Sequence, residues 1–264
     1  MKRYEPKQRY SVSKSQLDIL LYLLKYRFLT SDLFADILDK DRSTIYERLS
    51  VLDKQAYITK QYNKTFRIRQ RPATYCLASK GIRYLKNKQA IGRTQLHYKN
   101  KYFTEEQIDA QLLYVKIGLM LRKHYPDKLD SYTKYQLNPS DYIKPMPHLL
   151  LLVSDDKNMP GYLVEVFQAR TLSWRIRRRI NQHVDAADES DYPYPHLLLI
   201  AGNSSTERRI IKMTAELYAD FEIFTTTLDR IMSEDINIWL KPEEVDLDEY
   251  ETTQRVILPI EIEK

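Results

Sequence analysis

The chain has 264 residues, of which 43% are hydrophobic and 30% are charged, a composition typical of a globular protein with room for two cores. No apolar run approaches the roughly 20 residues of a membrane-spanning helix, and the basic N-terminus lacks a signal-peptide core. One cysteine and five glycines exclude an internal disulfide, a thiolate zinc site and a glycine-rich phosphate loop. We therefore expect a cytoplasmic protein with no membrane contact, no metal and no cofactor.

Basic and acidic residues are unevenly divided along the chain. Residues 1–103 contain 23 Lys and Arg against 8 Asp and Glu, whereas residues 104–264 contain 19 against 28. An excess of positive charge favours contact with nucleic acid. We therefore expect double-stranded DNA to be the partner of the first part; a basic surface that is only solvated is the alternative.

Three helices are predicted in the first part, each preceded by a side chain that can cap it. Leu17, Leu20 and Leu24 lie at helical spacing in the first helix, and Ile45 and Leu49 lie on one stripe of the third. The shorter helix between them contains the apolar residues of "LFADIL". The candidate capping residues are Ser13 or Ser15, Thr30 or Ser31, and Asp41 or Ser43.

Two strand-like segments follow the third helix. The basic segment 64–72, "KTFRIRQRP", joins "YITKQYN" to "ATYCLAS", and we expect all three to form a hairpin. Helix, short helix, helix and basic hairpin is the order of a winged helix-turn-helix. Residues 13–86 resemble bacterial members of that fold through "TIYERLSVLDKQAYI" and "TYCLASKGIRYL". A glycine often ends the third helix there, so Ala56 is expected to cost about 1 kcal/mol if it is left-handed.

The winged helix predicts which side chains face DNA. The start of the third helix fits the major groove, and alternating cations along the hairpin suit phosphates or a minor groove. A winged helix that binds protein is the alternative. The candidate DNA-binding residues are Arg42, Ser43, Thr44, Tyr46, Arg48, Lys64, Arg67, Arg69 and Arg71.

The second part begins with a helix that Thr104 caps and continues as strand, strand, helix, strand, helix and strand. This order predicts an α/β domain, so the whole chain is expected to be an α+β protein of two domains. The predicted divisions are a winged helix at 1–90, a basic linker at 91–103, an α/β domain at 104–240 and an acidic tail at 241–264.

The first two strands of this α/β part resemble the core of a PD-(D/E)xK nuclease. Such a core places an acid near the start of one strand and an acid-x-Lys on the next, where two carboxylates hold Mg²⁺. His148 occupies the place of the first acid, Glu165 that of the second and Phe167 that of the lysine. Histidine is a poor Mg²⁺ ligand, so we expect an inactive frame rather than an enzyme. A residual metal-dependent nuclease that uses His148, Asp155 and Glu165 is the alternative.

A basic helix and an acidic tail complete the chain. The helix around "WRIRRRINQH" carries either a second phosphate contact or a solvated face, and the candidate residues are Arg175, Arg178 and Arg179. Arg175 or Arg178 is expected to pair with the buried Glu165. In the tail, "EEVDLDEYE" is interpreted as mobile and "VILPIEIE" as an added edge strand. Such a tail could shield the basic domain or recruit a partner.

Taken together, the two parts resemble the replication-relaxation family of plasmids and integrative elements. The resemblance is carried by "RFLTSDLFADIL", "STIYERLSVL", "LASKGIRYL", "PMPHLLLLV", "GYLVEVFQART" and "YPHLLLIAG". His148 and Phe167 depart from the acidic residues typical of that family. The resemblance implies a DNA-binding protein of a mobile element that acts in replication or conjugative transfer, with replication or transfer proteins and a second copy of the chain as further partners. A transcriptional repressor is the alternative.

Overall fold

The computed structural model describes residues 12–62, 64–68, 70–88, 103–137, 145–154 and 161–260. Contacts between Cα atoms divide the chain into two units, Met1–Leu112 and Leu113–Lys264. Each unit has helices and one β-sheet in its described part, which confirms the predicted α+β class. The division falls within a long helix, so this helix contributes residues to both units.

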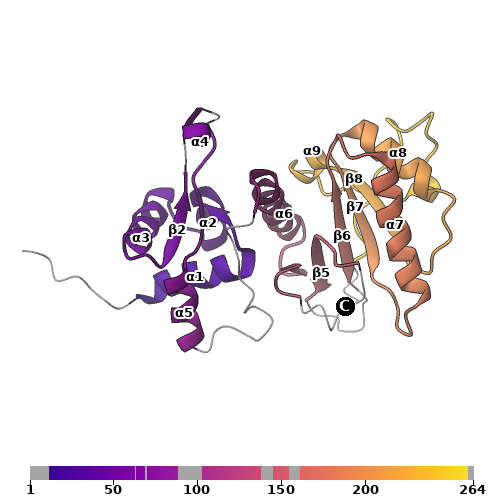
Figure 1. Ribbon diagram of the computed structural model, residues 1–264. Helices are drawn as coiled ribbons and strands as arrows, with labels where there is room; N and C mark the ends of the chain where they lie inside the picture. Colours follow the sequence, from indigo (N-terminus) through magenta and orange to yellow (C-terminus); the bar gives the residue numbers. More distant parts are fainter. Residues whose placement is uncertain are drawn as a thin grey trace, which may run out of the picture. The chain divides into compact units, whose positions relative to one another are not determined.

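Unit 1 is a set of helices around a small antiparallel sheet (Figure 1). In its described part, three strands have the order β1-β3-β2. Fully buried Leu20, Phe28, Phe34, Ile45 and Leu49 form the centre of the packing. The elements are α1 (Lys14–Tyr26), β1 (Leu29–Thr30), α2 (Ser31–Leu38), α3 (Arg42–Lys54), β2 (Ile58–Gln61), α4 (Lys64–Ile68), β3 (Thr74–Leu77), α5 (Ser79–Asn87) and the start of α6 (Glu105–His124).

Three helices begin with the side-chain caps that the sequence indicates, whereas Asp41, at the start of α3, makes no capping hydrogen bond through its side chain. The Ser13 hydroxyl accepts a hydrogen bond from the Gln16 N–H, and Gln16 returns one to the Ser13 N–H, which forms a capping box. Thr30 caps α2 through the Leu33 N–H, and Thr104 forms the same reciprocal pair with Gln107 before α6. These three predictions are confirmed.

The end of α3 carries the backbone conformation for which glycine is favoured. Ala56 has φ 58°, whereas Gln55 immediately before it has φ −83°. The Tyr57 N–H then bonds to the Leu52 carbonyl and closes the helix end. The left-handed residue predicted at Ala56 is therefore present, without the glycine that would relieve it.

The predicted extended hairpin between the two strands is wrong. Lys64–Ile68 form the short helix α4, which stands at the tip of the connection in Figure 1. Phe66 is buried, and its ring lies under the Arg71 guanidinium at 4.7 Å. Packing of Phe66 explains why strand-like alternation of cations was not realised. The strands on either side of this connection, β2 and β3, do pair, from Ile58 opposite Leu77 to Gln61 opposite Thr74.

Unit 2 is built on a mixed sheet whose described strands have the order β4-β5-β6-β7-β8. The β4–β5 and β5–β6 pairs are antiparallel, and the β6–β7 and β7–β8 pairs are parallel. The elements are the remainder of α6, β4 (Leu129–Thr133), β5 (Leu149–Val153), β6 (Tyr162–Phe167), α7 (Ser173–Asp188), β7 (His196–Ala201), α8 (Ser204–Thr214), β8 (Ile223–Thr227), α9 (Leu228–Ile231) and the 3₁₀ turn η2 (Pro242–Glu244).

The order of strands and helices from β5 to β8 agrees with the sequence prediction, but β4 lies in a segment for which no strand was predicted. Helix α7 lies across one face of the sheet, as Figure 1 shows. Its Ile176 and Ile180 pack with Leu163, Phe167 and Leu199 of β6 and β7. This contact fixes the position of α7 over β6.

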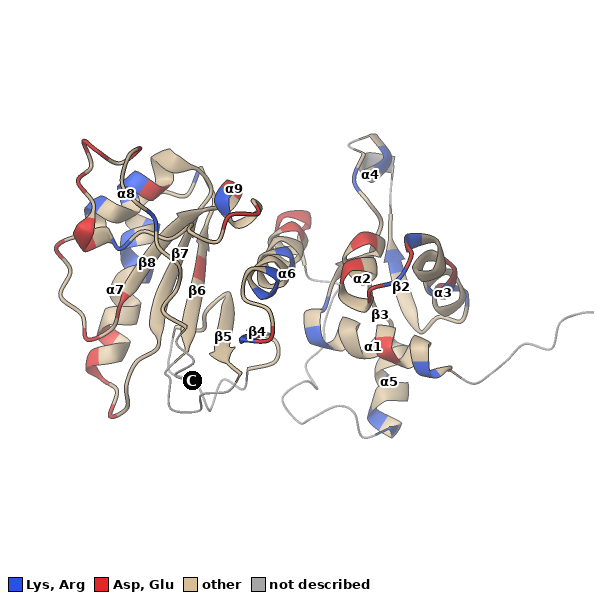
Figure 2. Ribbon diagram, turned by 180° about the vertical axis from the view of Figure 1, so that it is seen from behind, with Lys and Arg blue, Asp and Glu red and all other residues tan. Residues whose placement is uncertain are grey.

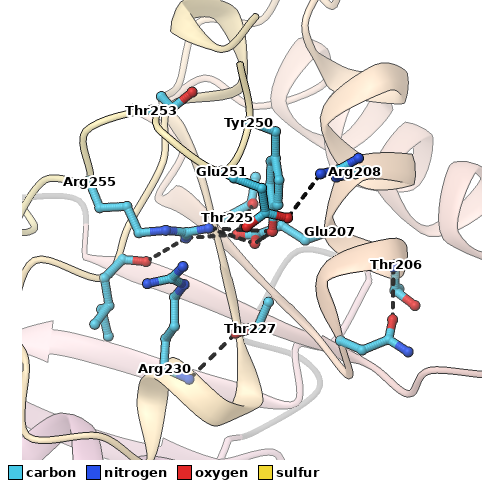
Figure 3. Close-up of polar contacts among 12 residues, drawn as sticks. Thr206, Glu207, Arg208, Thr225, Thr227, Arg230, Tyr250, Glu251, Thr253 and Arg255 are labelled. Atoms are coloured by element: carbon cyan, nitrogen blue, oxygen red, sulfur yellow. Dashed lines mark hydrogen bonds and ion pairs between the residues drawn. The ribbon is translucent and has the colours of Figure 1, made fainter. Parts of the chain in front are cut away.

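The acidic segment after η2 packs onto unit 2, so its interpretation as mobile is wrong. Tyr250 is buried and donates a short hydrogen bond to Glu207 of α8 (Figure 3). Arg255 contacts both carboxylate oxygens of Glu207, at 3.1 and 2.9 Å. Within the described residues, the edge strand expected at "VILPIEIE" is reduced to one isolated bridge, between Trp239 and Val256.

Within the described residues, no helix combines the length and apolar character needed to cross a membrane.

Candidate nucleic-acid interface and buried carboxylate site

The outer face of α3 presents most of the predicted DNA-binding residues to solvent. Arg42, Ser43 and Tyr46 are exposed, and Thr44 and Arg48 are half-buried. Blue Lys and Arg positions appear on α3 in Figure 2. The apolar stripe of the same helix faces the core, which explains why its polar residues share the opposite side. The first turn of α3 contains no acidic residue.

An open groove of about 570 Å³ lies between the start of α3 and the β2–β3 pair. The Lys60 side chain lies between two aromatic rings of this groove. Its Nζ atom is 5.7 Å from the Tyr46 ring centre and 5.5 Å from the Tyr62 ring centre. Cations and aromatic rings therefore line one concave surface. The lining residues are Ser31, Arg42, Ser43, Tyr46, Lys60, Tyr62, Arg71, Pro72, Ala73 and Tyr75.

Two cations in the groove already have carboxylate partners. Arg42 Nε lies 2.5 Å from Asp32 Oδ1, and both side chains are largely exposed. Arg71 contacts Glu105 Oε2 at 3.0 Å and also forms an ion pair with Asp109. These two acids lie one turn apart on α6. Arg71, a predicted DNA-binding residue, therefore has two carboxylate partners in the structure.

The remaining hairpin cations are only partly described. Arg67 is exposed on α4. Lys64 belongs to the same helix, but its side chain lies outside the described residues, as does Arg69. Because α4 is helical, Arg67 does not alternate with its neighbours along a strand.

The second candidate site is Glu165, which is fully buried in β6. In Figure 2 its strand shows one red band in an otherwise tan ribbon. Its Oε1 atom accepts hydrogen bonds from Arg179 Nη2 at 2.7 Å and from His183 Nε2 at 3.0 Å. Arg179 and His183 are four residues apart on α7, so one helix face supplies both donors.

The partners of His183 determine how its ring is oriented. A carboxylate only accepts hydrogen bonds, so Nε2 is the nitrogen that donates to Glu165. Nδ1 lies 2.8 Å from the Tyr194 hydroxyl, which donates to it. Burial raises the pKa of Tyr194, which keeps this hydroxyl protonated. Tyr194, His183 and Glu165 thus form a buried chain of hydrogen bonds.

His148 lies on the other side of the same carboxylate. Its Nδ1 atom is 3.1 Å from Glu165 Oε2 and accepts a hydrogen bond from the Val166 N–H at 3.0 Å. The Tyr114 ring stacks on the imidazole with 4.4 Å between ring centres. Burial lowers the pKa of His148 and raises that of Tyr114 to about 12. Within the described part of the chain, Glu165 Oε2 has no hydrogen-bond donor.

Charge balance fixes the protonation state of Glu165. Burial alone would raise its pKa, but His148, the His183 hydrogen bond and Arg179 lower the pKa to about 2. The carboxylate is therefore ionised and neutralised by Arg179. A divalent cation would have to displace this guanidinium before both oxygens could bind it. The arrangement is that of a buried ion pair with supporting hydrogen bonds.

The structure corrects and completes the predicted nuclease-like site. His148 and Glu165 are brought together, but the cation beside Glu165 is Arg179, not Arg175 or Arg178. Phe167, in the place of the lysine, packs into the core. Asp155 lies outside the described residues. In the portion that is described, no group of three or more His, Cys, Asp or Glu is arranged to hold a metal ion.

Several residues of both sites were missed from the sequence. Lys60 and Tyr62 lie between α3 and the more basic segment 64–72, and the charge of that segment predicted the phosphate contacts there instead. His183 could have been found, because it continues the spacing of Ile176 and Ile180 on the buried face of α7. Tyr114 carried no signal, since only folding brings α6 next to His148.

No family model, curated protein or solved structure matches this chain.

Proposed function

We propose that unit 1 is a winged helix that binds duplex DNA. The observation that carries the proposal is the groove beside α3, where exposed Arg42, Ser43 and Tyr46 stand beside Lys60 of the neighbouring strand. The β1-β3-β2 order, with α3 followed by the β2–β3 pair, is the arrangement that a winged helix requires. Side chains from the first turns of such a helix reach base edges in the major groove.

Contacts with the DNA backbone come from the cations around this helix. Lys60 and Arg67 are exposed in the structure and are suited to phosphates. Arg42 is paired only with an exposed aspartate, and such surface pairs stabilise a protein by about 0–1 kcal/mol. A DNA phosphate therefore competes readily for Arg42.

We propose that unit 2 is a nuclease-like frame that does not cleave DNA. The antiparallel β4-β5-β6 sheet, followed by α7 and the parallel β7, supports a relation to the PD-(D/E)xK core. Arg179 and His183 occupy the Glu165 oxygen that a metal would need. A frame with a neutralised carboxylate suits assembly with other proteins rather than hydrolysis.

The cellular role rests on the resemblance to the replication-relaxation family. We propose that the protein acts at DNA of a mobile element in replication or conjugative transfer, in the cytoplasm. A repressor of the same element is the alternative, and a binding site that overlaps a promoter favours it. A residual nuclease is the second alternative, because His148 and Glu165 lie side by side.

One experiment separates binding from cleavage. Labelled duplex DNA from the neighbourhood of the gene is mixed with the full chain in EDTA, Mg²⁺ or Mn²⁺, and both mobility shifts and shortened products are recorded. We expect a shift with intact DNA under all three conditions. Metal-dependent shortening that Glu165→Gln abolishes would instead establish the nuclease, and the absence of any shift would refute DNA binding.

A further inference from the structure

The start of α7 forms an exposed patch that differs in charge from the rest of unit 2. Trp174 is 56% exposed and Leu172 is 53% exposed. Arg175, Arg177 and Arg178 are also exposed on the same helix. We refer to these five residues as the α7 patch. It lies within a part of the chain in which acidic residues outnumber basic ones.

The arginines of the α7 patch are not neutralised by ion pairs within the described residues. No described carboxylate forms an ion pair with Arg175, Arg177 or Arg178. The first turn of α7 contains no acidic residue either. The Arg175 guanidinium instead lies 5.2 Å from the Trp174 ring centre. Repulsion among neighbouring cations is therefore not offset within the described residues, which favours an external polyanion.

The base of the α7 patch is held in place by the neighbouring helix. Arg209 of α8 donates to the Thr171 carbonyl and to the Ser173 hydroxyl, both at 3.2 Å. Ile176, between the exposed residues, is fully buried. The Trp174 ring therefore projects from a fixed helix end rather than from a loop. An aromatic side chain presented on a rigid element loses little entropy when a ligand stacks on it.

We propose that the α7 patch binds single-stranded nucleic acid, with an unpaired base stacked on Trp174 and phosphates on the arginines. An exposed indole beside guanidinium groups is suited to the face of an unpaired base and to the adjacent backbone. Duplex DNA offers phosphates to arginines, but its stacked bases are closed to an indole. This surface is separate from the groove of unit 1 and does not depend on duplex binding there.

The chain carries its own reporter for this contact. It has two tryptophans, Trp174 in the patch and the fully buried Trp239. The full chain is titrated with an oligothymidylate of roughly 12 nucleotides, a length within the range of single-strand sites. We expect quenching of the exposed tryptophan emission. Fluorescence anisotropy of labelled oligothymidylate measures affinity independently of tryptophan.

Four variants make the assignment specific. Trp174→Ala is expected to weaken oligothymidylate binding about tenfold, whereas Trp174→Phe keeps a stacking face and most of the affinity. Arg175→Gln with Arg178→Gln is expected to reduce the salt dependence by about 0.7 per cation. Tyr218→Ala removes another highly exposed ring outside the patch and should change nothing.

Two results would overturn the proposal. The first is oligothymidylate binding that Trp174→Ala leaves unchanged. The second is a tryptophan emission that is quenched by poly-glutamate but not by oligothymidylate. That result would assign the patch to an acidic protein. Duplex binding in unit 1 is tested separately with Arg42→Ala and Lys60→Ala, which should leave the oligothymidylate response intact. Failure of one site is thus distinguishable from failure of the other.

Discussion

The sequence predicted Glu165 as the remaining acid of a nuclease-like site, and in the structure its neighbours are a guanidinium and a hydrogen-bond donor. Arg179 and His183 share one of its oxygens, and His148 lies beside the other. Phe167, at the position predicted for a lysine, packs into the hydrophobic core and supplies no cation beside Glu165. These neighbours make Glu165 part of a buried ion pair, and this ion pair has measurable consequences.

Removing Arg179 should strongly destabilise unit 2. Arg179→Met leaves the Glu165 charge buried without its cation, and breaking such a pair costs about 3–5 kcal/mol. Arg178→Met, one residue earlier on the exposed side, should change stability by less than about 0.5 kcal/mol. Urea unfolding followed by Trp239 emission measures both. Equal effects of the two variants would contradict the assigned ion pair.

Acid should destabilise unit 2 through the same carboxyl. The pKa of Glu165 is lowered from 4.5 to about 2 in the folded chain. Its contribution to stability is therefore fully present above pH 4.5 and is lost as the pH falls toward 2, with a size on the order of 3 kcal/mol. Urea unfolding at a series of pH values should show that the stability of Glu165→Gln falls less steeply with decreasing pH than that of the native chain. A parallel pH profile for the variant would argue against an ionised Glu165.

Ala56 provides a test of backbone strain in unit 1. Ala56→Gly should increase stability by about 0.5–1 kcal/mol, because glycine relieves the left-handed conformation at φ 58°. Gln55→Gly is the matched control and should lower stability, because φ is −83° there. Hydrogen exchange of the most protected α1 and α3 amides measures both changes. A loss of protection in both variants would exclude strain at Ala56.

At the scale of elements, the connection between β2 and β3 is linked to α6. Arg71 at the base of this connection contacts Glu105 and Asp109, two partly exposed acids of α6. Ion pairs whose acids are open to solvent in this way are weaker than fully buried ones. A phosphate that approaches the groove can therefore recruit Arg71 by replacing the α6 carboxylates.

Removal of the two acids should strengthen duplex binding. Glu105→Gln with Asp109→Asn leaves Arg71 available, and we expect the salt dependence to steepen by about one unit. Asp18→Asn with Asp39→Asn changes the charge of unit 1 equally without touching Arg71. Anisotropy titrations at several salt concentrations compare the two. The same gain in both double variants would assign the effect to net charge alone.

Local sequence signals predicted elements well and their partners poorly. Ser13, Thr30 and Thr104 act within their own turns, so their caps were readable from the sequence. The helix at Phe66 depends on burial of its ring, and the Arg179 partner of Glu165 depends on how α7 crosses β6. Such contacts between distant segments leave no periodic signal in one sequence.

At the scale of the whole molecule, two units of opposite charge share one chain. The excess of cations before residue 104 was visible in composition, and the groove beside α3 gives this charge a surface. The acidic second part has its own internal organisation, because Glu207 binds Tyr250 and Arg255 of the C-terminal segment (Figure 3). The DNA partner of unit 1 stays a prediction from composition, and the contacts of Glu207 with the C-terminal segment left no signal in composition.

The salt dependence of duplex binding tests the central claim most directly. Anisotropy titrations compare the native chain with Arg42→Ala/Lys60→Ala/Arg67→Ala and with Lys116→Ala/Arg122→Ala/Lys123→Ala, which loses equal charge from α6. We expect the first variant to bind more weakly, with a salt slope shallower by about 0.9 per lost phosphate contact, and the second to resemble the native chain. Equal losses in both variants, or no duplex binding by the native chain, would contradict the account.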